Sequence, residues 1–292
     1  MFKGTRWKSV IRSCAGNVHR ELKISLARPA SPEKWVFIVG CYNSGTTLLR
    51  QVLASHSLIS ALPEEGQYLT DQLPSDHELG LSRMWVERED LYRLNETSEG
   101  PDIQRLKKEW GSRLDRSKPI FLDQTPANSA RTRWLQRHFA PAYFIAVVRN
   151  GYAVAEGIRR KAQPVHRRNG WPIEMAARQW RRSNEILLNE SKSLDRILWV
   201  TYEQLCEEPH RVLNEVAQFL GIDIAKELDL TSAWSVHERS QAIQNLNADS
   251  LRRLTSDDIK AINDECVQML QHFNYPVLDP SRLSASDANS KE

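Results

Sequence analysis

The chain has 292 residues, 40% hydrophobic and 26% charged, as is ordinary for a globular protein. Its net charge of +3 is too small to indicate a nucleic-acid partner, but it allows a local basic pocket for an anionic ligand. No apolar run approaches the roughly 20 residues of a membrane span, and the basic N-terminus lacks the apolar core of a signal peptide. We therefore expect no membrane span and a cytoplasmic location.

Four apolar runs, taken in chain order, predict buried parallel strands. They are WVFIVG at 35–40, PIFLDQTP at 119–126, YFIAVV at 143–148 and ILWVTY at 197–202. Helical spacing follows each run, and Pro209 begins the last of these helices, which ends at Gly221. Strands that alternate with helices predict a three-layer α/β/α fold around a central parallel sheet.

The same pass along the chain predicts a single domain at 35–276, with a helical insertion at about 62–118. An N-terminal leader at 1–34 precedes the domain, and a polar tail at 277–292 follows it. The basic triplet at 166–168 either meets an acidic substrate or faces water.

The segment GCYNSGTT at 40–47 joins the first strand to a helix, and the spacing of Gly40 and Gly45 matches a phosphate-binding P-loop. Glycines let the backbone wrap around phosphate, and the free N–H groups at a helix N-terminus point at the anion. Thr46 stands where a P-loop kinase has its lysine, which opposes ATP or GTP chemistry. Ser44, Thr46 and Thr47 offer hydroxyl groups instead.

SGTTLL after an apolar strand resembles the 5′-phosphosulfate loop of sulfotransferases, most nearly the bacterial and tyrosylprotein-type branch. These enzymes take a sulfuryl group from 3′-phosphoadenosine 5′-phosphosulfate (PAPS). The resemblance implies a P-loop-containing sulfotransferase fold, with Asn43, Ser44, Gly45, Thr46 and Thr47 at the phosphosulfate end of the donor.

The resemblance also implies a second contact region, for the 3′-phosphate of the donor. Arg149 ends the third strand, as the family's phosphate-binding arginine does, and a guanidinium suits phosphate because it can donate two parallel bonds. Gly157 stands where the family has a serine, so one hydroxyl contact is missing. Tyr202 is expected near the adenine or in the core, and Ser240 and Arg253 match a C-terminal donor-binding loop.

Sulfuryl transfer needs a base for the acceptor proton and positive charge or donors for the leaving phosphate. The resemblance places the base at Glu64 or Glu65, and the tight turn after Pro63 favours Glu65. Asn43 and Gln124 occupy positions that are often cationic in the family, so the charge there is lost. Arg50, His56 or Arg159 are candidates to compensate.

The sequence thus predicts an enzyme of the EC 2.8.2 class that uses PAPS as co-substrate without a metal. Its acceptor is a hydroxyl or amine on a small molecule, glycan or peptide, and its oligomeric state is not readable. Two alternatives stay open: a non-catalytic or weakly active relative that binds the donor, and a P-loop nucleotide kinase. For the kinase, Asp123 is the one candidate magnesium ligand at a strand end.

Overall fold

A computed structural model describes residues 21–22, 24–161, 171–223, 234–236, 239–241 and 243–281, without the side chains of 234–236 and 239–241. The basic triplet at 166–168, the leader up to residue 20 and the tail beyond residue 281 lie outside the described residues.

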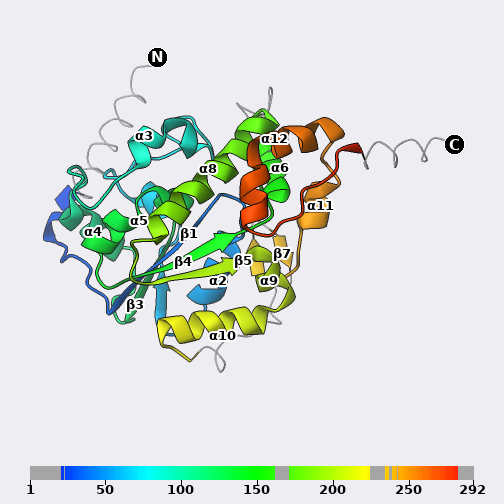
Figure 1. The fold of residues 1–292 in the computed structure, drawn as a ribbon. Coiled ribbons are helices and arrows are strands. Elements are labelled where there is room, and N and C mark those ends of the chain that lie inside the picture. The colour runs from blue at the N-terminus through cyan, green and yellow to red at the C-terminus, as the bar shows by residue number, and fades with distance from the viewer. Residues whose placement is uncertain are drawn as a thin grey trace, which may run out of the picture.

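A five-stranded parallel sheet forms the centre of the molecule, with strand order β2-β3-β1-β4-β5 (Figure 1). The strands are β1 Lys34–Gly40, β2 Ile59–Ala61, β3 Ile120–Gln124, β4 Ala142–Val148 and β5 Ile197–Thr201. β1 pairs with β3 on one side and β4 on the other, so Ile38 lies beside Gln124 and Gly40 beside Val147. The four predicted strands are confirmed, and β2 is an additional short edge strand.

Alternation along the strands sends side chains into two cores, one on each face of the sheet. Val36 and Ile38 of β1 face a core completed by α2 Thr46–Ala54 and α10 Pro209–Leu220. Trp35 and Phe37 face the opposite core, which includes side chains of α4 Ile103–Gly111, α5 Thr132–His138 and α8 Ile173–Ser191. Figure 1 shows α2 and α10 on one side of the sheet and α8 on the other. The predicted α/β/α layering is confirmed.

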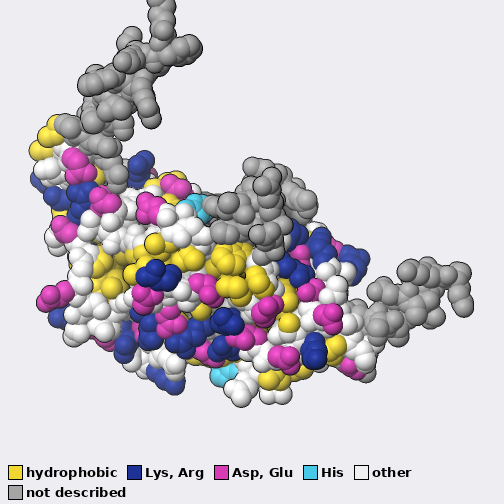
Figure 2. All heavy atoms as spheres, turned by 90° about the horizontal axis from the view of Figure 1, so that it is seen from above, with side chains coloured by type: hydrophobic (Ala, Val, Ile, Leu, Met, Phe, Trp, Pro, Cys, Tyr) yellow, Lys and Arg dark blue, Asp and Glu magenta, His cyan; other side chains and the backbone are white. Residues whose placement is uncertain are grey.

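The layer above the sheet is built on α8 Ile173–Ser191, the longest helix among the described residues. A third apolar cluster joins it to α6 Gly151–Lys161 and α12 Ser256–His272. Seen from above, basic and acidic side chains lie next to each other on this face (Figure 2). Opposite charges neutralise each other there in ion pairs such as Arg181–Glu265, at 2.8 Å.

The remaining helices are short connections. They are α3 Glu89–Tyr92, α4 Ile103–Gly111, α5 Thr132–His138, α9 Tyr202–Glu207 and α11 Asn247–Leu251, with 3-10 turns η1 Gly66–Leu69, η2 Trp85–Arg88 and η3 Pro126–Ala130. Regular helix in the segment 62–118 is limited to α3, α4 and two 3-10 turns, and the rest of that segment is irregular. A two-stranded antiparallel hairpin, β6 Trp234–Val236 and β7 Arg239–Gln241, precedes α11.

Candidate active site

The carboxyl ends of β1, β3 and β4 meet at the middle of the sheet, where the chain order of neighbouring strands reverses. Open parallel sheets bind ligands at such a switch point. The loop after β1 lies between Gln124 at the end of β3 and Arg149 just after β4. The structure therefore brings together the two segments that the sequence singled out.

Backbone shape in the loop at 40–47 requires the residues found there. Gly45 has a φ of 93°, and a Cβ atom on it would lie 2.5 Å from the Tyr202 ring. A Cβ atom on Gly40 would lie 2.3 Å from the carbonyl oxygen of Val147. Asn43 has a φ of 62°, a left-handed conformation that asparagine adopts more readily than most residues. The loop thus packs closely against β4 and against Tyr202 at the start of α9.

Two buried polar groups in this loop lack a hydrogen-bond partner among the described residues. They are the hydroxyl of Ser44, which is fully buried, and the amide nitrogen Nδ2 of Asn43. Buried donors are nearly always satisfied in folded proteins, so these two are available to an acceptor that binds at the loop. Both precede the N-terminus of α2, where backbone N–H groups and the helix dipole favour an anion.

Gln124 and Thr46 complete this side of the site. The amide of Gln124 donates to the Thr46 hydroxyl oxygen at 3.1 Å, and both residues are buried. Because that oxygen accepts from Gln124, the hydroxyl proton of Thr46 stays available for a ligand. Gln124 therefore orients the loop and brings no charge to it.

Arg149 lies against the loop, as predicted. Its Nη1 donates to the carbonyl oxygen of Asn43 at 2.9 Å, and its Nε donates to Asn247 at 2.7 Å. Its guanidinium stacks on the Tyr202 ring, 4.1 Å from the ring centre, and burial lowers its pKa. Tyr202 is buried, and its ring packs between Gly45 and Arg149, while its expected place near the adenine stays a prediction.

Two of the other predicted donor contacts, Gly157 and Arg253, lie on or next to α6. A Cβ atom on Gly157 would lie 3.3 Å from Asn43 Cγ, so this glycine faces the loop. Arg253 follows α11 and comes within 3.9 Å of Glu156 on α6. Ser240 belongs to β7, and its side chain is outside the described residues. Lys161, at the end of α6, has its pKa lowered to about 7 by burial and by the neighbouring Arg83, Arg160 and Arg149.

On the opposite side of the loop, a rigid turn presents Glu65. The N–H of Gly66 donates to Asp123 Oδ1 at 2.9 Å and to Thr125 Oγ1 at 2.8 Å, and the carbonyl of Gly66 accepts from the Trp110 indole at 3.0 Å. A Cβ atom on Gly66 would lie 2.7 Å from Trp110, so only glycine fits. The turn is anchored on both sides, and Glu65 is held at its N-terminal end.

The carboxyl group of Glu65 is half-buried and accepts from the Gln67 amide at 2.8 Å. Burial and, to a lesser extent, the nearby carboxylates of Asp76 and Asp123 raise its pKa to about 8, while Arg83 opposes the shift. A carboxyl group with a pKa near the working pH is suited to general base catalysis. Glu64, the alternative candidate, is exposed to solvent.

Comparison with known proteins agrees with this arrangement. A model of the sulfotransferase family matches residues 36–226. The chain belongs to the sulfotransferase family. The branch within the family stays a prediction.

Solved structures share the sulfotransferase fold. The sulfotransferase domain of the Synechococcus PCC 7002 olefin synthase is 24% identical, with a TM-score of 0.55, over 85% of this chain and 97% of that domain. The sulfotransferase domain from the curacin biosynthetic pathway is 23% identical, with a TM-score of 0.52, over 86% and 100%. A Mycobacterium avium sulfotransferase is 14% identical, with a TM-score of 0.52, over 91% and 82%.

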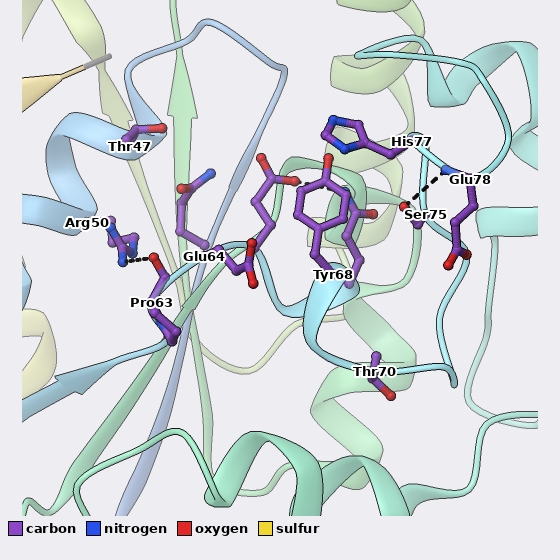
Figure 3. A pocket seen from close by; sticks show the side chains of 12 residues that line it. Thr47, Arg50, Pro63, Glu64, Tyr68, Thr70, Ser75, His77 and Glu78 are labelled. Atoms are coloured by element: carbon purple, nitrogen blue, oxygen red, sulfur yellow. Dashed lines mark hydrogen bonds between the residues drawn. The ribbon is translucent and has the colours of Figure 1, made fainter. Parts of the chain in front are cut away.

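A cavity of about 500 Å³ opens beside the loop of this sulfotransferase. Figure 3 shows Thr47 and Arg50 of α2 on one side, Ser75, His77 and Glu78 on the other, and Tyr68 between them. Glu64, Glu65, Gln67 and Gln124 also line it. The cavity therefore connects the predicted base to the predicted donor loop.

The three side chains expected to compensate for the missing charge have other partners. Arg50 donates to the carbonyl oxygens of Leu62 and Pro63, at 2.6 and 2.7 Å. Arg159 forms an ion pair with Asp258 at 2.7 Å. His56 is buried, and its Nδ1 accepts from the Leu58 N–H. Arg159 and His56 are thus engaged elsewhere, whereas the charge of Arg50 stays at the cavity lining and its compensating role stays a prediction.

Sequence reasoning missed three residues that shape the site. Glu203 accepts from the Asn150 N–H at 3.0 Å and from the Asn247 amide at 2.6 Å, and so fixes the partner of Arg149. Asp76 accepts from the Tyr68 hydroxyl at 2.5 Å, and Arg83 donates to Asn43 Oδ1 at 3.2 Å. Glu203 directly follows the tyrosine of the VTYEQL segment, which was the available signal. No sequence signal pointed to Asp76 or Arg83.

Proposed function

We propose that this chain transfers a sulfuryl group from PAPS to a hydroxyl or amine acceptor. The observation that carries the proposal is the pair of buried, unpartnered donors, Ser44 Oγ and Asn43 Nδ2, before the N-terminus of α2. A phosphosulfate is an anion with several acceptor oxygens, and it satisfies such donors. The residues present therefore fit the donor of the family.

The chain's own groups divide the work of holding this donor. The backbone of 43–47, with the hydroxyls of Ser44, Thr46 and Thr47, would bind its phosphosulfate end. Arg149 and Arg253, together with the surface of α6 around Gly157, would bind the nucleotide's 3′-phosphate end. Ser240 is a further proposed contact there. No group of three or more metal-ligating side chains occurs in the described part of the chain.

PAPS supplies an activated sulfuryl group, whose bond from sulfur to the 5′-phosphate oxygen breaks as a new bond from sulfur to the acceptor oxygen or nitrogen forms. Glu65, unprotonated, accepts the proton that the acceptor releases. The loop donors stabilise the charge that develops on the leaving phosphate oxygen. Asn43 and Gln124 position the loop, through the Arg83 and Thr46 contacts.

The charge of the cavity lining limits the charge of the acceptor. Glu64 and Glu78 line the cavity against a single arginine, Arg50, so its lining carries an excess of negative charge even while Glu65 is protonated. Like charges repel more strongly in a partly desolvated cavity than in water. We infer a small neutral or cationic acceptor, a phenol, amine or amino sugar, in preference to an acidic peptide or an acidic glycan.

The two alternatives receive less support. The kinase alternative needs Asp123 as a magnesium ligand, but both of its oxygens already accept hydrogen bonds, from Gly66, Thr125 and Asn128. The donor-binding alternative rests on the neutral Asn43 and Gln124, and Arg83 offers the charge that these two lack.

A helix long and apolar enough to cross a membrane does not occur in the described part of the chain. The cytoplasmic location stays a prediction.

Incubation with PAPS labelled in its sulfate, and with matched acceptors, tests the proposal. Tyramine, para-ethylphenol and para-hydroxyphenylacetate share a phenol and differ in charge. We expect label transfer to the first two to exceed transfer to the third, and Glu65→Gln to abolish it. Failure of the chain to bind 3′-phosphoadenosine 5′-phosphate (PAP) at millimolar concentration would contradict the proposed function.

A further inference from the structure

The donor loop of this sulfotransferase lacks a charged side chain in the segment 43–47, and its neighbour Gln124 is neutral as well. Transfer of a sulfuryl group leaves negative charge on the 5′-phosphate, and a positive charge close to it stabilises that state most effectively. A cation is therefore required from another part of the fold.

Arg83 reaches the loop from the irregular part of the insertion. Its Nη1 donates to Asn43 Oδ1 at 3.2 Å, across 40 positions of sequence. Its guanidinium carbon lies 5.9 Å from the centre of the Tyr42 ring. It acts on Glu65 as well, because its charge opposes the rise in that residue's pKa. Arg83 thus contacts the donor loop and is close enough to the candidate base to act on its charge.

The backbone at Arg83 is held in an uncommon conformation. Its φ is 65°, in the left-handed region that residues with long side chains rarely adopt. The buried carboxylate of Asp76 accepts from the Arg83 N–H at 2.7 Å and fixes this turn. Strained residues that are fixed by their surroundings gather at functional sites, and this one projects a cation toward the loop.

Most N–H groups of the Arg83 side chain are not used in hydrogen bonds within the described part of the chain. Within the described part of the chain, Asn43 is the one hydrogen-bond partner of the Arg83 guanidinium. A guanidinium has five N–H donors, so most of them are left for an anion. Lys161, the other nearby cation, has a pKa of about 7 and is a weaker source of charge.

We propose that Arg83 binds the 5′-phosphate end of the donor and carries the positive charge that Asn43 and Gln124 lack. This inference rests on the proposed function. It makes Arg83 a catalytic residue supplied by the insertion, with Asp76 as its positioning residue.

Calorimetric titration of the full chain with two nucleotides tests this role without an acceptor. PAP has both phosphates, and adenosine 3′-phosphate lacks the 5′-phosphate. We expect Arg83→Gln to weaken PAP binding by about 10- to 100-fold, the range for one charged hydrogen bond, and to change adenosine 3′-phosphate binding less than about twofold. Arg83→Lys is expected to retain most of the PAP affinity.

Two further variants sharpen the result. Asn43→Lys combined with Arg83→Gln returns a cation to the loop and is expected to restore PAP affinity to within about fivefold of the wild type. Arg88→Gln is the matched control, because Arg88 belongs to the same insertion and pairs with Asp90 at the surface, at 3.1 Å. It is expected to bind both nucleotides as the wild type does.

Equal PAP affinity of Arg83→Gln and the wild type would overturn the role of Arg83 and leave the proposed function intact. An equal loss of affinity for both nucleotides would also overturn the role of Arg83, because such a result would show that the residue acts only on the structure. A wild-type chain that binds neither nucleotide would contradict the proposed function itself.

Discussion

The two walls of the candidate active site are built in different ways. The loop after β1 is a strand–turn–helix connection with no charged side chain at 43–47, and it offers hydroxyls, amides and a helix N-terminus. The wall at 62–88 is irregular, and it carries Glu65, Asp76 and Arg83. In the proposed function, the regular wall binds the anion and the irregular wall supplies the charges for chemistry. Changes to each wall are therefore expected to act on different steps.

The largest effect is expected from Glu65→Gln in the irregular wall. Loss of a general base lowers kcat by about 100- to 10,000-fold, while PAP binding to the other wall stays within about twofold. Label transfer from PAPS to tyramine measures the first quantity and calorimetry the second. Glu64→Gln is the control, because Glu64 is exposed and is expected to retain most activity. A larger loss from Glu64→Gln would reassign the base.

Gly45→Ala should damage the regular wall. The new Cβ atom would meet the Tyr202 ring at 2.5 Å in a backbone with a φ of 93°. Strain and overpacking together should lower the free energy of unfolding by about 2–4 kcal/mol and weaken PAP binding. Denaturant unfolding and calorimetry measure these effects. Gly80→Ala separates the two causes, since Gly80 has a φ of 67° with open space around it. If both variants lose equal stability, the clash with the Tyr202 ring contributes nothing to the loss, and backbone strain alone accounts for it.

The pH dependence should report on the irregular wall. Because the pKa of Glu65 is raised to about 8, kcat/KM should rise about tenfold per pH unit below that value and level off above it. An activity that is flat between about pH 6 and 8 would contradict the assignment of the base.

The same shift has a consequence for stability. A carboxyl group with a raised pKa binds its proton more tightly in the folded state than in the unfolded one. The stability from this proton is complete below the ordinary value of 4.5 and is lost as pH rises through about 8. The free energy of unfolding of Glu65→Gln should therefore exceed that of the wild type by about 0.5–2 kcal/mol near pH 9, and by less near pH 5. Thermal unfolding at the two pH values checks this difference.

The smallest effect is expected from Gln124→Ala. It removes the 3.1 Å hydrogen bond to Thr46, and one neutral hydrogen bond contributes about 0.5–1.5 kcal/mol. PAP affinity should fall by about two- to tenfold, with the pH dependence of kcat/KM unchanged. A shifted pH profile would show that Gln124 acts on the base as well as on the donor loop.

The regular wall was readable from the sequence because its chemistry lies in a contiguous, periodic segment. The predicted strand at 35–40 is β1, and the helix predicted from Pro209 to Gly221 is α10 Pro209–Leu220. β2 escaped prediction because Ile59–Ala61 is too short for a pattern.

The irregular wall was only partly readable. Glu65 was predicted from the family resemblance and from its turn, but its neighbours Asp76 and Arg83 were not. Their contacts depend on a left-handed turn and on a hydrogen bond across 40 positions, and neither leaves a local pattern. Asp123 was interpreted as a candidate metal ligand because it ends a strand. The structure shows it as the anchor of the Gly66 turn.

A crystal structure of the full chain with PAP tests the central claim most directly. We predict the 5′-phosphate within hydrogen-bond distance of the Ser44 and Thr46 hydroxyls and of the Arg83 guanidinium, with the Glu65 carboxylate facing it across the cavity. A nucleotide bound away from the loop at 43–47, with Ser44 still unpartnered, would contradict the account.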